Sequence, residues 1–216
     1  MTAILPALVA GLLGVPFGSG ARALARRYCG RPSVPGAPLL EGVMAVVWAL
    51  LAVRLWPTHP AAVPAYLMLA FICVTLAVID LRTKLLPNRI TYPALPLVAA
   101  LLLVASAAEH DLSAMARALE AAGLAGVAFL ALVLISPSGL GLGDVKFALV
   151  LSLALGWLGW TAVAAGFFGA FLLGGVAALV AMVILRLGRK AQLPFGPCLA
   201  AGALLAVLAG AHVTTG

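Results

Sequence analysis

Eight apolar runs, separated by short connections rich in charge, glycine or proline, follow one another along the chain. Most of them approach the roughly 20 residues that an α-helix needs to cross the hydrocarbon core of a bilayer. The pattern therefore predicts an all-α, polytopic membrane protein with about eight transmembrane helices. The runs are 3–20, 39–56, 63–79, 91–108, 117–136, 145–157, 161–185 and 196–213.

The boundary between the sixth and seventh runs is the least marked, because the chain is apolar almost without interruption from Val145 to Leu185. Two glycines and two tryptophans stand within it, in the segment GWLGW at 156–160. Glycine favours turns, and tryptophan is enriched where a membrane meets water. We therefore predict a turn at the membrane surface there.

The composition supports the same class of protein. Of the 216 residues, 65% are hydrophobic and 9% are charged, whereas soluble domains have roughly 45–50% apolar and about 25% charged residues. This excludes an ordinary water-soluble globule, a disordered segment and a disulfide-bonded secreted module. A net charge of +7 would suggest a nucleic-acid partner in a polar protein. Here we attribute it to membrane topology, and expect a lipid bilayer and no nucleic acid as a partner.

The basic residues predict the topology. Eleven of the thirteen fall in the connections that follow the first, third, fifth and seventh runs, and only Arg54 and Arg117 lie toward the other side. Because Lys and Arg collect on the cytoplasmic side, we expect both termini outside. The first run has no basic residue before it, which favours a retained helix over a signal peptide. We expect a single integral membrane domain over 1–216.

The cysteines indicate neither a disulfide framework nor a zinc site. Cys29, Cys73 and Cys198 lie far apart in the sequence and never form a CxxC pair, the spacing that such sites use. We therefore expect no metal and no cofactor.

Four of the six acidic residues have an ordinary explanation. Glu109, Asp111 and Glu120 lie in or beside the connection between the fourth and fifth runs, where water solvates a carboxylate. Glu41 lies at the start of the second run, near a helix N-terminus that favours negative charge.

Asp80 and Asp144 are different, because each lies where an apolar run meets the cytoplasmic side. Ionisable groups at membrane depth are costly and point to function. Two carboxylates held together in a low dielectric share a proton, as in aspartic proteases, where one activates water and the other protonates the carbonyl oxygen. Gly141 and Gly143 would let another chain approach Asp144 closely. The pair therefore predicts a peptide-cleaving site.

A structural interpretation of the same residues stays open at this point. Asp144 could cap the helix that begins at 145, and Asp80 could pair with Arg82 or Lys84.

Three segments resemble the motifs of the type IV prepilin peptidase family. The segment IDLRTKLLPNRIT, which contains Asp80, resembles the family's first aspartate motif. Gly141-Leu-Gly-Asp-Val-Lys146 resembles its GxGD motif, and Pro194-Phe-Gly-Pro197 is similar to its PFGP element. The motifs occur in the family's order over most of the chain.

The N-terminal region resembles the family less closely. Phe17-Gly-Ser19 with Arg27 faintly resembles its N-terminal signature, although Arg22 stands where an asparagine is expected. Many members carry paired CxxC motifs after the first helix, associated with N-methylation, whereas this chain has only Cys29 there. The resemblance therefore implies peptidase activity and leaves N-methyltransferase activity in doubt.

Carried over to this chain, the resemblance implies that Asp80 and Asp144 are the catalytic dyad. It implies that Gly141 and Gly143 shape the backbone beside Asp144. Lys146 could tune the dyad, hold a substrate carbonyl or simply set topology. The remaining residues would line the cytoplasmic opening of the site or only pack: Pro194, Phe195, Gly196 and Pro197.

The function implied is that of a membrane-embedded aspartic endopeptidase. Its partner would be a prepilin or pseudopilin-like precursor, cleaved where a basic leader joins an apolar helix. The enzyme would be multi-pass in the bacterial cytoplasmic membrane, with its active site facing the cytoplasm. Neither the precursor nor the oligomeric state follows from the sequence.

Two other interpretations were weighed. A small proton-coupled transporter would use Asp80 and Asp144 as a relay, but it predicts polar groups near the middle of the membrane, where the runs have almost none. A non-catalytic component of a secretion apparatus would tolerate Asp→Asn changes at both positions.

Overall fold

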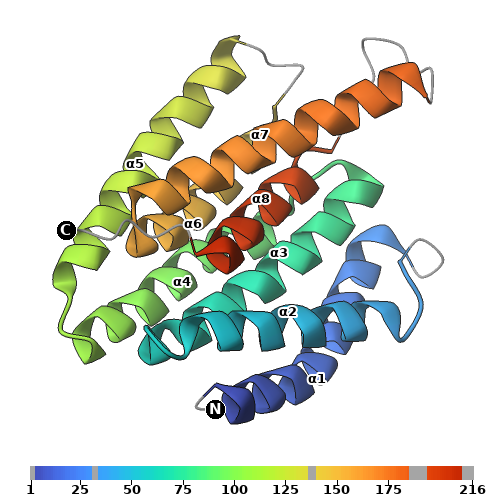
Figure 1. Cartoon of the computed structure of the whole chain (residues 1–216). Coiled ribbons are helices and arrows are strands. Elements are labelled where there is room, and N and C mark those ends of the chain that lie inside the picture. Colours follow the sequence, from blue (N-terminus) through green and yellow to red (C-terminus); the bar gives the residue numbers. More distant parts are fainter. Residues whose placement is uncertain (1–2, 31–33, 136–139, 185–193, 211–216) are drawn as a thin grey trace.

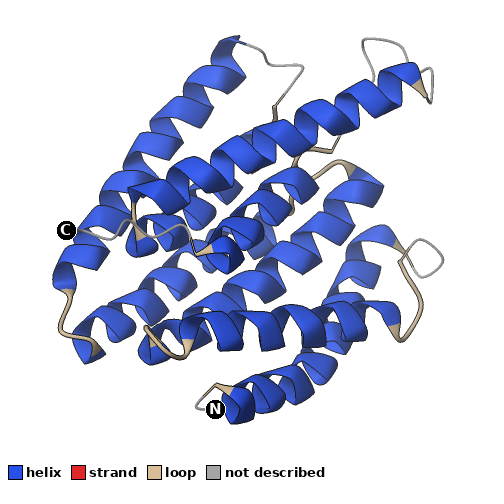
Figure 2. Ribbon diagram, viewed as in Figure 1, coloured by secondary structure: helices blue, strands red, loops and turns tan. Residues whose placement is uncertain are grey.

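The computed structural model describes residues 3–30, 34–135, 140–184 and 194–210. Within these ranges every regular element is a helix and no strand is present (Figure 2). The all-α class predicted from the apolar runs is therefore confirmed. In chain order the helices are α1 (Ile4–Cys29), α2 (Leu39–Leu55), the short 3-10 helix η2 (Pro60–Ala62), α3 (Val63–Thr83), α4 (Asn88–Ala108), α5 (Leu112–Ile135), α6 (Leu142–Leu158), α7 (Trp160–Val183) and α8 (Gly196–Ala209).

The helices have the lengths and surfaces of a polytopic membrane protein. Five are long and apolar enough to cross a bilayer: α1, α3 with η2, α4, α5 and α7. Helices α2 and α6 have 17 residues each and α8 has 14. Large apolar side chains such as Leu12 on α1 and Phe168 on α7 are exposed, as expected for surfaces that face lipid. That all eight helices cross, and that both termini lie outside, stay predictions.

Three pairs of consecutive helices pack against each other: α1 with α2, α5 with α6, and α7 with α8. Helix α3 lies between these pairs and contacts α1, α2, α4 and α8 (Figure 1). Helices α3 and α6 carry many of the largest fully buried side chains, among them Tyr66 and Phe147. The two aspartates of interest therefore belong to the two most deeply buried helices.

Because consecutive helices alternate in direction, the bundle has two distinct ends. The end of α3 and the starts of α4, α6 and α8 lie together, toward the upper right of Figure 1. We call this the aspartate end, because it carries Asp80 and Asp144. The end of α6 and the connections around His59 and His110 lie at the other end, which we call the far end.

Small residues allow the closest helix contacts. A Cβ atom on Gly18 would come within 2.5 Å of the Glu41 Cα atom, and one on Gly202 within 2.5 Å of the Ala170 nitrogen. The turn predicted at 156–160 is confirmed, since α6 ends and α7 begins on either side of Gly159. Its φ of 146° favours glycine.

Candidate active site

Asp80 lies in the last turn of α3, and its side chain is buried, with only 4% of the residue exposed. Its Oδ2 atom accepts a hydrogen bond of 2.9 Å from the backbone N–H of Gly196, the first residue of α8. The start of α8 therefore points its free N–H groups and the positive end of its dipole at this carboxylate.

Gly196 leaves the space that the Asp80 carboxylate occupies. A Cβ atom at this position would lie 2.8 Å from Asp80 Oδ2 and 3.2 Å from its Cγ atom. Any larger residue would push the carboxylate away from the N–H that holds it.

Asp144 lies at the third position of α6, and its Oδ2 atom accepts a hydrogen bond of 2.9 Å from the Gly141 N–H. The Asp144 N–H in turn donates to the Gly141 carbonyl oxygen at 3.0 Å. The carboxylate thus makes the half of a capping box that an N3 side chain supplies, whereas Gly141 has no side chain for the other half. Asp144 is therefore not the N-cap of a helix that begins at 145, since α6 begins at Leu142. In the described chain this contact uses one of the two carboxylate oxygens.

The fold brings the two aspartates to the same end of the bundle across 64 positions of sequence. Helix α3, which carries Asp80, contacts both α6 and α8. Within the described residues neither aspartate forms a salt bridge with Lys or Arg. The pairing of Asp80 with Arg82 or Lys84, the structural alternative, is not found. Both bases are exposed.

Lys146 does not face Asp144, because residues two apart lie on different sides of a helix. Its Nζ atom donates to Asn88 Oδ1 at 2.8 Å and lies 4.4 Å from the centre of the Tyr92 ring. Lys146 therefore joins α6 to the first turns of α4. Sequence reasoning did not single out Asn88 and Tyr92, although Asn88 stands in the segment that contains Asp80.

The two glycines before Asp144 have different surroundings. A Cβ atom on Gly143 would come within 2.9 Å of the Leu86 Cβ atom, whereas one on Gly141 would have no atom nearer than 3.7 Å. Gly143 thus lets the connection after α3 lie directly on the start of α6. A Cβ atom on Gly141 would make ordinary contacts with Asp144 Oδ2 and the Gly143 nitrogen.

The segment Pro194–Pro197 leads into α8. The Phe195 ring packs against Phe171 of α7, with ring centres 5.4 Å apart, and its edge lies where a side chain on Gly174 would be. The segment therefore does two things: it fixes α8 against α7, and through Gly196 it contacts Asp80. Pro194 and Pro197 are partly exposed.

The remaining acidic residues of the aspartate end have ordinary partners. Glu41 is buried and forms an ion pair of 2.6 Å with Arg22, which joins α1 to α2. The structural role predicted for Glu41 therefore fits, with a partner that the sequence did not indicate. In the described residues no group of three His, Cys, Asp or Glu side chains is placed to hold a metal ion.

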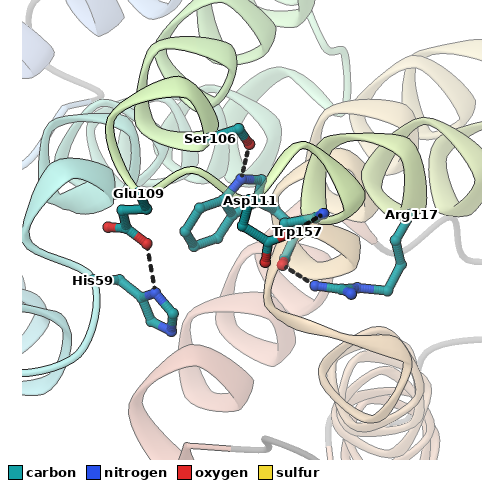
Figure 3. Close-up of polar contacts among 7 residues, drawn as sticks. His59, Ser106, Glu109, Asp111, Arg117 and Trp157 are labelled. Atoms are coloured by element: carbon teal, nitrogen blue, oxygen red, sulfur yellow. Dashed lines mark hydrogen bonds and ion pairs between the residues drawn. The ribbon is translucent and has the colours of Figure 1, made fainter.

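The far end carries a separate polar network, shown in Figure 3. His59 Nδ1 lies 2.8 Å from Glu109 Oε2, and Trp157 Nε1 donates to Ser106 Oγ at 2.8 Å. Arg117 donates to the carbonyl oxygens of Gly156 and Trp157 at 2.8 and 2.7 Å. These contacts join the ends of α4 and α6 to the start of α5.

Comparison with known proteins points to one family. The model of the type IV leader peptidase family matches residues 67–180, more than half of the chain. The matched range includes Asp80 and Asp144 but neither α1, α2 nor α8. No solved structure matches the chain.

Curated proteins from three organisms match over most of the chain, and each is named prepilin leader peptidase/N-methyltransferase. The protein of Bacillus subtilis is 34% identical over 80% of this chain and 66% of its own length. That of Aeromonas hydrophila is 31% identical over 87% and 63%, and that of Burkholderia pseudomallei 34% over 82% and 55%. The chain thus spans less than two thirds of the length of each of these relatives.

Proposed function

Because the chain belongs to the type IV leader peptidase family, we propose that it is a membrane-embedded aspartic endopeptidase with Asp80 and Asp144 as its catalytic dyad. The observation that carries this proposal is the state of Asp80. Its carboxylate is buried, is held by one backbone N–H, and lies at the same end of the bundle as Asp144, without a basic partner among the described residues. Structural carboxylates in such places are normally neutralised by a cation.

The dyad supports hydrolysis of a peptide bond by a general acid and a general base. One ionised carboxylate takes a proton from water while the water oxygen bonds to the scissile carbonyl carbon, and the protonated carboxyl donates to the carbonyl oxygen. When the tetrahedral intermediate collapses, the C–N bond breaks and the amine leaves with a proton returned by the dyad. The hydrogen bonds from Gly196 and Gly141 orient the carboxylates.

The other site residues have supporting roles in this proposal. Gly141 shapes the backbone beside Asp144 and donates the hydrogen bond to its carboxylate, and Gly143 admits Leu86. Lys146 fixes α6 against α4. Residues 194–197 form the border of the site at α8.

We propose a type IV prepilin or pseudopilin-like precursor as the substrate, cleaved where its basic leader meets an apolar helix. The names of the relatives support this choice. The protein would be one integral domain of the bacterial cytoplasmic membrane, with the aspartate end facing the cytoplasm. We do not extend the proposal to the N-methyltransferase part of those names, because the sequence lacks paired CxxC motifs. The comparisons give the transporter alternative no support.

The test is cleavage of a candidate precursor by the detergent-purified protein, with the new N-terminus located by mass spectrometry. We expect one cut at the end of the leader, and none with Asp80→Asn or Asp144→Asn. Glu120→Gln is the matched control, since Glu120 is an exposed carboxylate on α5. Normal cleavage by either Asp→Asn variant would reject the dyad.

A further inference from the structure

A groove at the far end lies between α2 and α8, at the surface that faces lipid. Its volume is about 420 Å³, and four of its five lining residues are apolar. The lining residues are Leu50, Val53, Arg54, Pro57 and Leu208. The groove is therefore lined mainly by apolar side chains, and Arg54 is the cation among its lining residues.

The Arg54 guanidinium has no acceptor in the described part of the chain. It lies against the end of α8, so close to Gly210 that a side chain there would overlap it. Yet it makes no hydrogen bond or ion pair with a described residue. Arg117, the other arginine of the far end, donates two hydrogen bonds to carbonyl oxygens. No described residue thus takes up the Arg54 donors.

Exposed tryptophans place Arg54 at the depth of lipid headgroups. Trp56 follows it by two residues and is 40% exposed, and Trp160 at the start of α7 is 43% exposed. Tryptophan gathers at the boundary between hydrocarbon and water. A half-buried cation at this depth is costly unless it reaches an anion.

We propose that this groove binds an anionic phospholipid, with its phosphate on Arg54 and an acyl chain along Leu50, Val53 and Leu208. The planar fork of a guanidinium matches two phosphate oxygens, and the apolar walls match a hydrocarbon chain. A lipid with a net negative headgroup is favoured over a zwitterionic one, whose own cation repels the guanidinium. A phosphate ion alone would leave the apolar walls empty.

The experiment measures lipid retention by the full-length protein in native mass spectrometry. Phosphatidylglycerol and phosphatidylcholine with identical acyl chains are titrated in turn, with inorganic phosphate as competitor. We expect phosphatidylglycerol to bind about tenfold more tightly than phosphatidylcholine, a difference typical of one charge-assisted contact. Inorganic phosphate should compete weakly.

Three variants separate the parts of the proposal. R54Q should bind both lipids equally. R27Q replaces an exposed arginine of the aspartate end and should keep the wild-type preference. V53W fills the groove and should weaken the binding of both lipids. If R54Q is poorly folded, R54M tests the same point, because it removes the charge and keeps an apolar side chain of similar length. An unchanged preference in R54Q or R54M, or competition by inorganic phosphate at equal concentration, would overturn the proposal.

Discussion

The two ends of the bundle differ in how their central polar groups are partnered. At the far end, side chains find partners in neighbouring helices: His59 with Glu109, and Trp157 with Ser106. The aspartate end also has such contacts, Arg22 with Glu41 and Lys146 with Asn88. Asp80 and Asp144, however, accept only backbone N–H groups within the described residues, so each has one carboxylate oxygen that no described residue contacts by a hydrogen bond.

Helix α6 belongs to both ends and shows the difference most directly. Its end is fixed by Arg117 and Ser106, and by the Tyr66 hydroxyl, which donates to the Ala154 carbonyl oxygen at 2.7 Å. Its start carries Asp144, which the described chain contacts only through the helix's own first turn. The start of α6 is held by Lys146 and by the contact of Gly143 with Leu86, and not by a side-chain partner of the Asp144 carboxylate in the described chain.

The largest effect is expected at the aspartate end, from Gly196→Ala. The added methyl group would come within 2.8 Å of Asp80 Oδ2, and misplacing a reacting group by about 1 Å costs on the order of a hundredfold in rate. We expect precursor cleavage to fall by about that factor, with a normal unfolding temperature. Gly175→Ala is the control, because no atom lies within 4 Å of the added group.

The second largest effect is expected at the far end, where a substitution should lower stability and leave activity unchanged. Trp157→Phe removes the donor to the buried Ser106 hydroxyl, and an unsatisfied buried group costs about 1–3 kcal/mol. We expect the unfolding free energy to fall by that amount, measured by denaturant titration, while the cleavage rate of the folded enzyme is kept. Adding Ser106→Ala should restore part of the loss. Loss of cleavage without loss of stability would contradict the division between the ends.

A smaller effect is expected from Asn88→Ala, which removes the acceptor of Lys146. A hydrogen bond to a charged group contributes about 1.5–3 kcal/mol. Its loss should weaken the attachment of the start of α6 to α4. We expect kcat to fall about fivefold to tenfold with KM unchanged. Tyr92→Phe keeps the ring under the Lys146 ammonium and should cleave normally, so an equal loss there would contradict this role.

The smallest effect concerns Asp111 at the far end. Hydrogen bonds from the Ser113 hydroxyl and the Ala114 N–H hold the pKa of its carboxyl below the usual value. The ionised carboxylate therefore stabilises the start of α5 at every pH above the usual Asp pKa. The stabilisation is lost as the pH falls through the lowered pKa. Asp111→Ala should cost about 0.5–1 kcal/mol near neutrality and less in acid. Asp111→Asn keeps the acceptor and should lower the unfolding free energy little. If the loss caused by Asp111→Ala grew in acid, this capping role would be contradicted.

The helices were predictable because their signal is local. Apolar length identifies each helix, and the turn at Gly159 follows from the two glycines of its segment. The predicted first and third helices were too short, since α1 continues to Cys29 and α3 to Thr83. Polar residues such as Arg22 end an apolar run without ending a helix.

The site was predictable only in part, because its contacts join distant segments. The two aspartates stand out as carboxylates beside apolar runs. The hydrogen bond from Gly196 to Asp80 spans 116 positions and that from Lys146 to Asn88 spans 58. No local pattern encodes either contact. The same holds for the ion pair of Arg22 with Glu41, which depends on how α1 meets α2.

The hydrogen bond between Gly196 and Asp80 has a consequence for biogenesis. A growing polypeptide that has been synthesised as far as α6 already contains both aspartates, but the residue that orients the first is not yet made. The orientation of Asp80 seen in the folded protein therefore has to wait for the synthesis of α8. If Asp80 belongs to a catalytic dyad as proposed, the dyad is complete only after that helix has packed.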